Sequence, residues 1–194
     1  PDGAWNHKAM RIADMTYETH NRSNSAKFDY TFDVVADQRV ALFFGPRAGH
    51  STDYCGAEMN VEILEVFDHS GTPEIRVGDT WDLKRDWSDQ SNPNGRWEFG
   101  DCSGGSLGEI FGSLENWKLN PIPGATSKLQ PAWASSSGVA GFAKIVNDKP
   151  FGMDTDTQVG DIVANPWASA RWISPTNCKI RVTGRTWMPR PSDP

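Results

Sequence analysis

The stretch "AKFDYTFDV", residues 26–34, alternates without a break between apolar and polar side chains. Phe28, Tyr30 and Phe32 share one face, while the aspartates share the other. A repeat of two residues is the period of a β-strand with one buried face. The next apolar run, "RVALFFG" at residues 39–45, follows a short polar break, so the two runs predict a β-hairpin.

A third segment alternates with an interruption. In "EMNVEILEVF", residues 58–67, Met59, Val61 and Ile63 share one face. The apolar pattern then shifts by one residue at Leu64. A one-residue shift inside a strand is the signature of a β-bulge, which we therefore expect at this point.

Two similar stretches lie far apart in the chain: "EIRVGDTWDL", residues 74–83, and "CKIRVTGRTWM", residues 178–188. Their flanking residues differ, so they predict two strands with the same face pattern and not a duplicated domain. The second stretch has one extra residue beside Gly184. Glycine is the usual first residue of a G1 bulge, and a bulge there would return Trp187 to the inward face of the strand.

One segment has a helical period. In "SLGEIFGSLENWKL", the apolar side chains Leu107, Ile110, Phe111, Leu114 and Trp117 recur at intervals of three and four residues. Ser106 and Glu109 have the spacing of a capping box. The sequence thus predicts a short capping helix near residues 107–118, followed by a long Pro/Gly/Ser-rich loop over residues 121–138.

The chain contains 18 glycines and 13 prolines, and this composition favours short strands joined by turns. Its 194 residues are enough to form one domain with a sizeable hydrophobic core. We therefore expect an all-β single domain over residues 1–194, a β-sandwich or jelly roll with the one capping helix.

Charge and composition exclude several classes of protein. The net charge of −6 argues against a general nucleic-acid-binding protein, and the chain lacks an apolar run long enough for a membrane span. The three cysteines, Cys55, Cys102 and Cys178, leave two arrangements open: one disulfide with one free thiol, or three free thiols. Together with an Asn21-Arg22-Ser23 glycosylation triplet, the sequence favours an extracellular location.

The nine tryptophans divide by their surroundings. Trp87, Trp133 and Trp167 lie among turn residues, and Asp86 precedes the first of them. An aromatic ring beside polar groups can bind a sugar through its C–H face, so these residues predict a carbohydrate site. The alternative is that each ring plugs an end of the sandwich. The tryptophans on apolar faces are expected in the core: Trp81, Trp97, Trp117 and Trp187.

The acidic segment "DTDTQVGD" is the best candidate for a metal site. Asp154, Asp156 and Asp161 could supply the hard oxygen ligands that Ca²⁺ prefers. The spacing matches an EF-hand only in part, and the alternative is a solvated acidic turn.

Three functions follow from these features. The first is a secreted binding module for carbohydrate that uses loop tryptophans and calcium. The second is a structural subunit of an extracellular filament, shell or coat, formed by self-association. The third is a β-sandwich polysaccharide hydrolase or lyase, for which Glu62, Glu65 and Asp82 are candidate carboxylates.

Overall fold

The computed structural model describes residues 21–45, 54–67, 75–102, 107–118, 129–136, 140–147 and 156–189. These residues form one 3-10 turn and eleven strands: η1 (Arg22–Asn24), β1 (Ala26–Val34), β2 (Arg39–Phe44), β3 (Cys55–Val66), β4 (Thr80–Asp82), β5 (Trp97–Asp101), β6 (Ser113–Lys118), β7 (Leu129–Ala134), β8 (Gly141–Lys144), β9 (Ile162–Ala164), β10 (Ala168–Ile173) and β11 (Cys178–Trp187). None of the described helices could cross a membrane, since none has the necessary length and apolar character.

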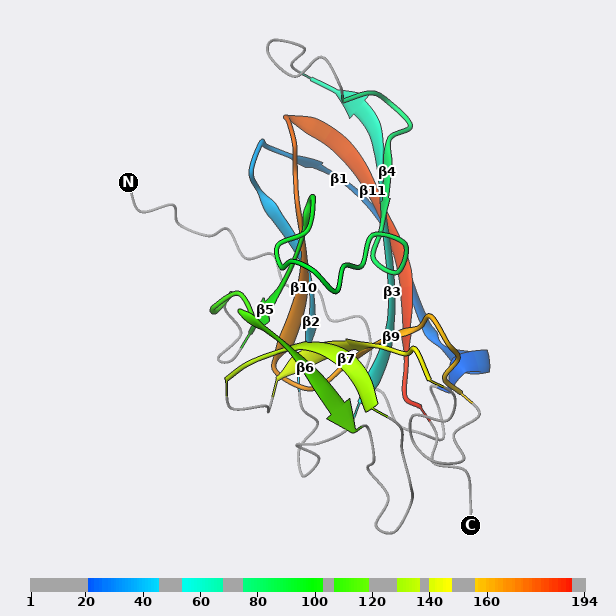
Figure 1. The fold of residues 1–194 in the computed structure, drawn as a ribbon. Helices are drawn as coiled ribbons and strands as arrows, with labels where there is room; N and C mark the ends of the chain where they lie inside the picture. The colour runs from blue at the N-terminus through cyan, green and yellow to red at the C-terminus, as the bar shows by residue number, and fades with distance from the viewer. Residues whose placement is uncertain are drawn as a thin grey trace.

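The strands form two antiparallel sheets packed face to face, which confirms the β-sandwich. The large sheet has the order β1-β11-β3-β9-β8-β7-β6, and β4 pairs with the part of β3 that β9 leaves free. The small sheet has the order β2-β10-β5. Figure 1 shows β6 and β7 lying across the lower end of the long strands β3, β10 and β11.

Aromatic side chains fill the space between the two sheets. Phe142 on β8 packs edge-on against Phe44 on β2, with ring centroids 5.7 Å apart, and against Phe99 on β5 at 5.1 Å. Near the other end, Trp81 on β4 packs against Trp172 on β10 at 5.4 Å. Burial of these large rings is the main stabilising term for a domain of this kind.

The predicted strand at residues 26–34 is confirmed as β1, but the hairpin is wrong. β1 pairs with β11 along its whole length, whereas β2 pairs with β10 in the other sheet. The turn between them therefore carries the chain from one sheet to the other. Its backbone is tied to the 174–177 turn, because Asn177 Oδ1 accepts from the Ala36 amide and the Asp37 amide donates to Ser174 O.

The bulge predicted in β3 is confirmed. Lys179 pairs with Glu65 and Ile180 with Ile63, so Leu64 is the extra residue. The bulge predicted beside Gly184 is wrong, since the register runs unbroken from Ile180 to Trp187.

Trp187 consequently lies on the opposite face of β11 from Val182. Its ring packs across Gly56 of the neighbouring strand, where an added Cβ would come within 2.0 Å of the ring. Gly184 has a different reason to be glycine: a Cβ there would lie 2.0 Å from the Glu58 carbonyl and 2.5 Å from the Phe28 ring.

The helix predicted over residues 107–118 is wrong. Residues 107–112 have no regular helix, and residues 113–118 are strand β6, which pairs with β7. Leu114 lies opposite Trp133, while Trp117 packs over Gly141 on the other face of the sheet. Each face of the strand thus offers an apolar contact, and pairing with β7 replaces the helical hydrogen bonds. β7 also lies within the segment that was expected to be one long loop, residues 121–138.

The two similar stretches differ in structure. Residues 178–187 form one continuous strand, but residues 77–78 form a turn in which Gly78 has φ of 91°. Only Thr80–Asp82 of the first stretch is a strand. Trp81 lies on the inward face as expected, because it pairs with the buried Val61.

Candidate functional site

Two of the three tryptophans predicted to bind sugar are buried. Trp87 is 8% exposed and Trp133 is 5% exposed. The Trp87 ring packs on Phe99 at 4.9 Å and its Nε1 donates to Asp89 Oδ1. The Trp133 Nε1 donates to the carbonyl of Ser88 at 2.8 Å. These contacts are those of rings that plug the sandwich.

Trp167 is 37% exposed and stands apart from that pair. It occupies the turn between β9 and β10 with φ of 67°. Its amide donates to Phe44 O, and its carbonyl accepts from the Cys102 amide. Asp86, the fourth predicted residue, lies in the turn after β4 and accepts two hydrogen bonds from the Arg85 guanidinium.

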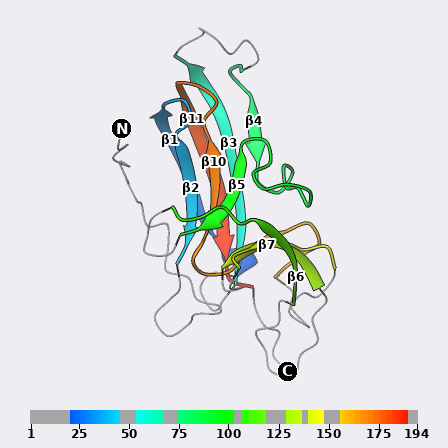
Figure 2. The same ribbon diagram turned by 60° about the vertical axis from the view of Figure 1, so that its left-hand side comes forward.

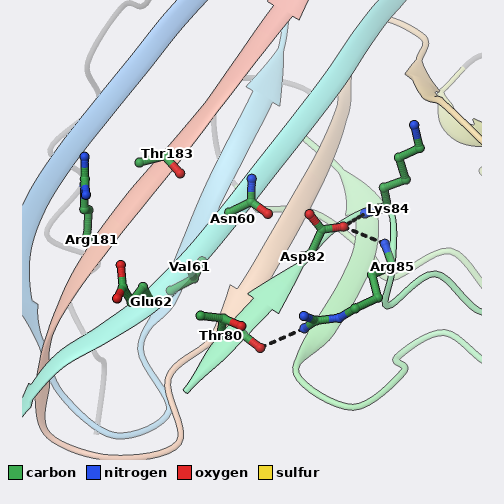
Figure 3. Close-up of a pocket in the computed structure, with 9 residues that line it drawn as sticks. All are labelled: Asn60, Val61, Glu62, Thr80, Asp82, Lys84, Arg85, Arg181 and Thr183. Atoms are coloured by element: carbon green, nitrogen blue, oxygen red, sulfur yellow. Dashed lines mark hydrogen bonds between the residues drawn. The ribbon is translucent and has the colours of Figure 1, made fainter. Parts of the chain in front are cut away.

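A polar hollow of about 650 Å³ lies on the outer face of the large sheet beside β4 (Figure 3). Figure 2 shows β4 on the far side of β3 from β11. Residues of these three strands and of the turn after β4 line the hollow. We call it the first hollow; it is lined by Asn60, Val61, Glu62, Thr80, Asp82, Lys84, Arg85, Arg181 and Thr183.

Strand register explains why these side chains meet. Glu62 pairs with Thr80 on one side and with Arg181 on the other. Asn60 pairs in the same way with Asp82 and Thr183. Directly paired residues project to the same face of a sheet, and Met59, Val61 and Ile63 already occupy the inner face. The polar residues between them must therefore project outward.

The three cations of the first hollow are already paired. Arg181 donates to both carboxylate oxygens of Asp29, at 2.8 and 2.6 Å. Lys84 Nζ lies 3.0 Å from Asp161 Oδ1, and Arg85 Nε lies 2.6 Å from Asp86 Oδ1. The guanidinium of Arg181 accordingly lowers the pKa of Asp29.

Four other side chains in the first hollow have no such partner. Among the described residues, Asn60, Glu62, Thr80 and Thr183 make no hydrogen bond through their side chains. Together they present an amide, a carboxylate and two hydroxyls to whatever fills the hollow. A ligand rich in hydroxyl groups could satisfy all of them.

A second hollow of about 600 Å³ adjoins the first, and Thr80 and Arg85 line both. Its other lining residues are Trp81, Asp86, Asn94, Gly95, Arg96 and Trp97. Trp81 is half-buried against the core, and its indole N–H has no partner among the described residues. A tryptophan expected in the core is therefore also one of the residues that line a polar hollow.

The exposed edge of β4 is closed by side chains. Arg85 Nη2 donates to Thr80 O at 2.7 Å, and the Asp82 amide donates to Asp86 Oδ2 at 2.8 Å. Burial raises the pKa of Asp86, but hydrogen bonds from Arg85, the Asp82 amide and Trp97 outweigh it, so the pKa lies below its usual value. Asp86 is therefore an ionised cap on the strand, and it also lines the second hollow.

The outer edge of β5 is covered by the backbone of residues 108–111, whose amides and carbonyls bond to Phe99 and Asp101, and by one amide side chain. Asn92 Oδ1 accepts from the Phe99 amide and Asn92 Nδ2 donates to Phe99 O, both at 2.8 Å. Capping an edge strand in this manner prevents another chain from pairing with it.

The three carboxylates proposed for catalysis do not all lie in the same hollow. Glu62 and Asp82 both line the first hollow, whereas Glu65 lies outside it and contacts Lys179 Nζ at 3.1 Å. Asp82 Oδ1 accepts from the amides of Lys84 and Arg85, at 2.9 and 2.6 Å. It therefore holds the turn that forms one wall.

Of the three predicted calcium ligands, the structure describes Asp156 and Asp161. Asp154 lies outside the described residues. Asp161 is buried between the cations of Arg22 and Lys84, and its Oδ2 also accepts from the Gln158 amide. A calcium ion would have to displace two ion pairs to reach it, and no cluster of three metal-ligating side chains occurs in the part of the chain that the structure describes.

All three cysteines are free thiols. Burial raises the pKa of Cys102 to about 12, and its Sγ donates to Ala168 O at 3.2 Å, so the thiol stays protonated near neutral pH. The asparagine of the glycosylation triplet, Asn21, is 7% exposed and caps η1 by accepting from the Asn24 amide. Its side chain is thus committed to a structural role.

Searches with this chain found no match among protein-family models, curated proteins or solved structures.

Proposed function

We propose that the protein is an extracellular carbohydrate-binding module whose site is the pair of hollows around β4. The observation that carries this proposal is the set of polar side chains without hydrogen bonds in the first hollow, together with the half-buried Trp81 among the residues that line the second. Sugars bind to proteins through these two kinds of contact: hydrogen bonds to hydroxyls and packing of a C–H face on an aromatic ring.

The ion pairs around these side chains favour binding because they make the walls of the hollow rigid. The ion pairs of Arg181, Arg85 and Lys84 fix the walls before a ligand arrives. A preformed site loses less conformational entropy on binding than one that must order itself. We propose binding and not hydrolysis, because Asp82 is committed to the turn amides and only Glu62 remains as an unpaired carboxylate in the first hollow.

Glu62→Gln tests this site. We expect the variant to fold normally and to lose about tenfold in affinity for its glycan, since a hydrogen bond to a charged group contributes about 1.5–3 kcal/mol. A glycan array identifies the ligand, and calorimetry then compares the variants.

The matched control is Glu65→Gln, which removes the same charge from the same strand outside both hollows and should leave affinity unchanged. Equal affinities for the Glu62→Gln variant and the parent would contradict the proposed site.

A second candidate function, self-association into a larger structure, is favoured by the edge of β6. Side chains close the outer edge of β4, and the backbone of residues 108–111 with Asn92 covers that of β5. By contrast, β6 pairs with β7 on one side and with no described strand on the other. Residues 112–116 are exposed, including Leu114 at 40%. An open edge of this kind can pair with the same edge of a second copy.

Leu114→Lys tests this second candidate, because a lysine on an edge strand opposes pairing. If β6 joins two copies, the parent protein should show a concentration-dependent dimer by sedimentation, and the variant should remain a monomer. Val77→Lys, which changes an apolar residue that is 64% exposed elsewhere, is the control. A parent that stays monomeric at all concentrations would rule the candidate out.

A further inference from the structure

The second hollow contains a cation without a counterion. Among the described residues, the Arg96 guanidinium makes no hydrogen bond or ion pair, in contrast to Arg85, Lys84 and Arg181 around the first hollow. Arg96 lines the second hollow together with Trp81. Of the four cations that line the two hollows, the chain thus neutralises Arg85, Lys84 and Arg181 itself and leaves the charge of Arg96 unpaired, in the hollow that Trp81 also lines.

The backbone holds Arg96 in this position. Asn94 and Trp97 exchange two backbone hydrogen bonds, of 2.9 and 3.0 Å, around the tight turn that contains Gly95 and Arg96. Gly95 has φ of 56°, which a glycine adopts without strain. The carbonyl of Arg96 also accepts from the Ile173 amide of the small sheet. The turn is therefore tied to the sandwich from two sides.

The uncommitted charge in the first hollow is negative. Glu62 makes no hydrogen bond or salt bridge among the described residues, and Thr80 and Arg85 line both its hollow and that of Arg96. A carboxylate on the ligand would be attracted to Arg96, with which it can form two parallel hydrogen bonds. The same carboxylate beside Glu62 would meet a like charge.

We infer, resting on the proposed function, that the ligand is an acidic glycan in which a uronic acid unit is linked to an uncharged unit. The uronic acid lies on Trp81 with its carboxylate on Arg96, since one such ring carries both an apolar C–H face and an anion. The uncharged unit lies in the first hollow, where its hydroxyls donate to Glu62 and bond with Asn60 and Thr183.

Three oligosaccharides of equal length distinguish the possibilities: one alternating glucuronic acid with N-acetylglucosamine, one of neutral glucose units, and one of galacturonic acid alone. We expect the alternating probe to bind at least tenfold more tightly than the other two at low salt. Near 1 M salt, where the Debye length falls to about 3 Å, its advantage over the neutral probe should shrink.

Arg96→Gln should remove that advantage and leave the weaker binding of the neutral probe intact. Arg96→Lys keeps the charge without the planar fork and should give an intermediate affinity. Arg76→Gln, an exposed arginine outside both hollows, is the control and should bind like the parent. Glu62→Gln should improve binding of the galacturonic acid probe, because it removes the like charge.

The outcomes separate this inference from the function on which it rests. Tightest binding of the neutral probe, unaffected by Arg96→Gln, would overturn the acidic ligand and leave carbohydrate binding standing. Binding of none of the probes, together with a blank glycan array, would overturn both.

Discussion

Trp87→Ala is expected to destabilise the protein by about 3–5 kcal/mol, the usual loss when a buried aromatic side chain is truncated. The ring is 8% exposed, packs on Phe99 and donates its N–H to Asp89, so the truncation opens a cavity and breaks a hydrogen bond. In a domain of this size the melting temperature should fall by roughly 10 °C. Thermal and urea unfolding measure the loss.

Trp167→Ala is the matched control, because it makes the same truncation at a ring that is 37% exposed. Its loss of stability should be clearly smaller. Any Trp87→Ala protein that remains folded should keep its affinity for glycan. Small, equal losses for both variants, with glycan binding abolished only in Trp87→Ala, would instead restore Trp87 as the sugar platform.

Gly56→Ala is the second change with a large expected effect. The added Cβ would lie 2.0 Å from Trp187 Cε2, well inside van der Waals contact. The indole cannot simply move away: its Nε1 donates to Asp156 O at 3.0 Å, and the guanidinium groups of Arg22 and Arg185 lie 4.9 and 5.4 Å from its ring centroid. Overpacking a closed site costs about 1–3 kcal/mol and sometimes more.

Gly112→Ala provides the comparison, because no heavy atom lies within 4 Å of the Cβ it would add. There the loss of unfolded-state entropy should leave stability unchanged or raise it by about 0.4–1 kcal/mol. Equal melting temperatures for the two alanine variants would mean that Trp187 does not pack over Gly56 as described.

Local alternation was enough to predict the strands whose faces are chemically distinct. In β1 and β3 most of the apolar positions face the core, with Phe32 the exposed exception, and the bulge at Leu64 appears as a shift of phase. Alternation does not predict the position of Trp187, whose ring lies on the outer face of the large sheet. Its surroundings come from Gly56 on the neighbouring strand and from Arg22, which is far away in the sequence.

The helical spacing of the apolar residues in 107–118 gave a wrong prediction for a related reason. Leu114 and Trp117 are three residues apart and would share a helix face, but in β6 they lie on opposite faces of a strand. Each finds an apolar neighbour, Trp133 on one face and Gly141 on the other. A short segment with apolar residues on both faces fits either structure, and pairing with β7 decides between them.

The candidate site depends on register, which the sequence does not display. Alternation places Asn60 and Glu62 on the outer face of β3, but their meeting with Arg181 and Thr80 requires strands from distant parts of the chain. The tryptophans of turn-rich segments looked exposed from their polar neighbours, yet Trp87 and Trp133 are buried. Polar residues next to a tryptophan in the sequence indicate a turn, but they do not show whether its ring is buried.

The most direct test of the account follows the indole N–H signals of the nine tryptophans by ¹H–¹⁵N NMR during titration with the alternating acidic oligosaccharide. Trp81→Phe assigns the Trp81 signal by its disappearance, and Trp87→Phe and Trp133→Phe assign the other two. Because the Trp81 N–H has no partner among the described residues and Trp81 lines the second hollow, its signal should shift on binding. The signals of Trp87 and Trp133, whose N–H groups already bond to Asp89 and Ser88, should stay in place. Shifts at Trp87 or Trp133 with none at Trp81 would contradict a binding site in the hollows around β4.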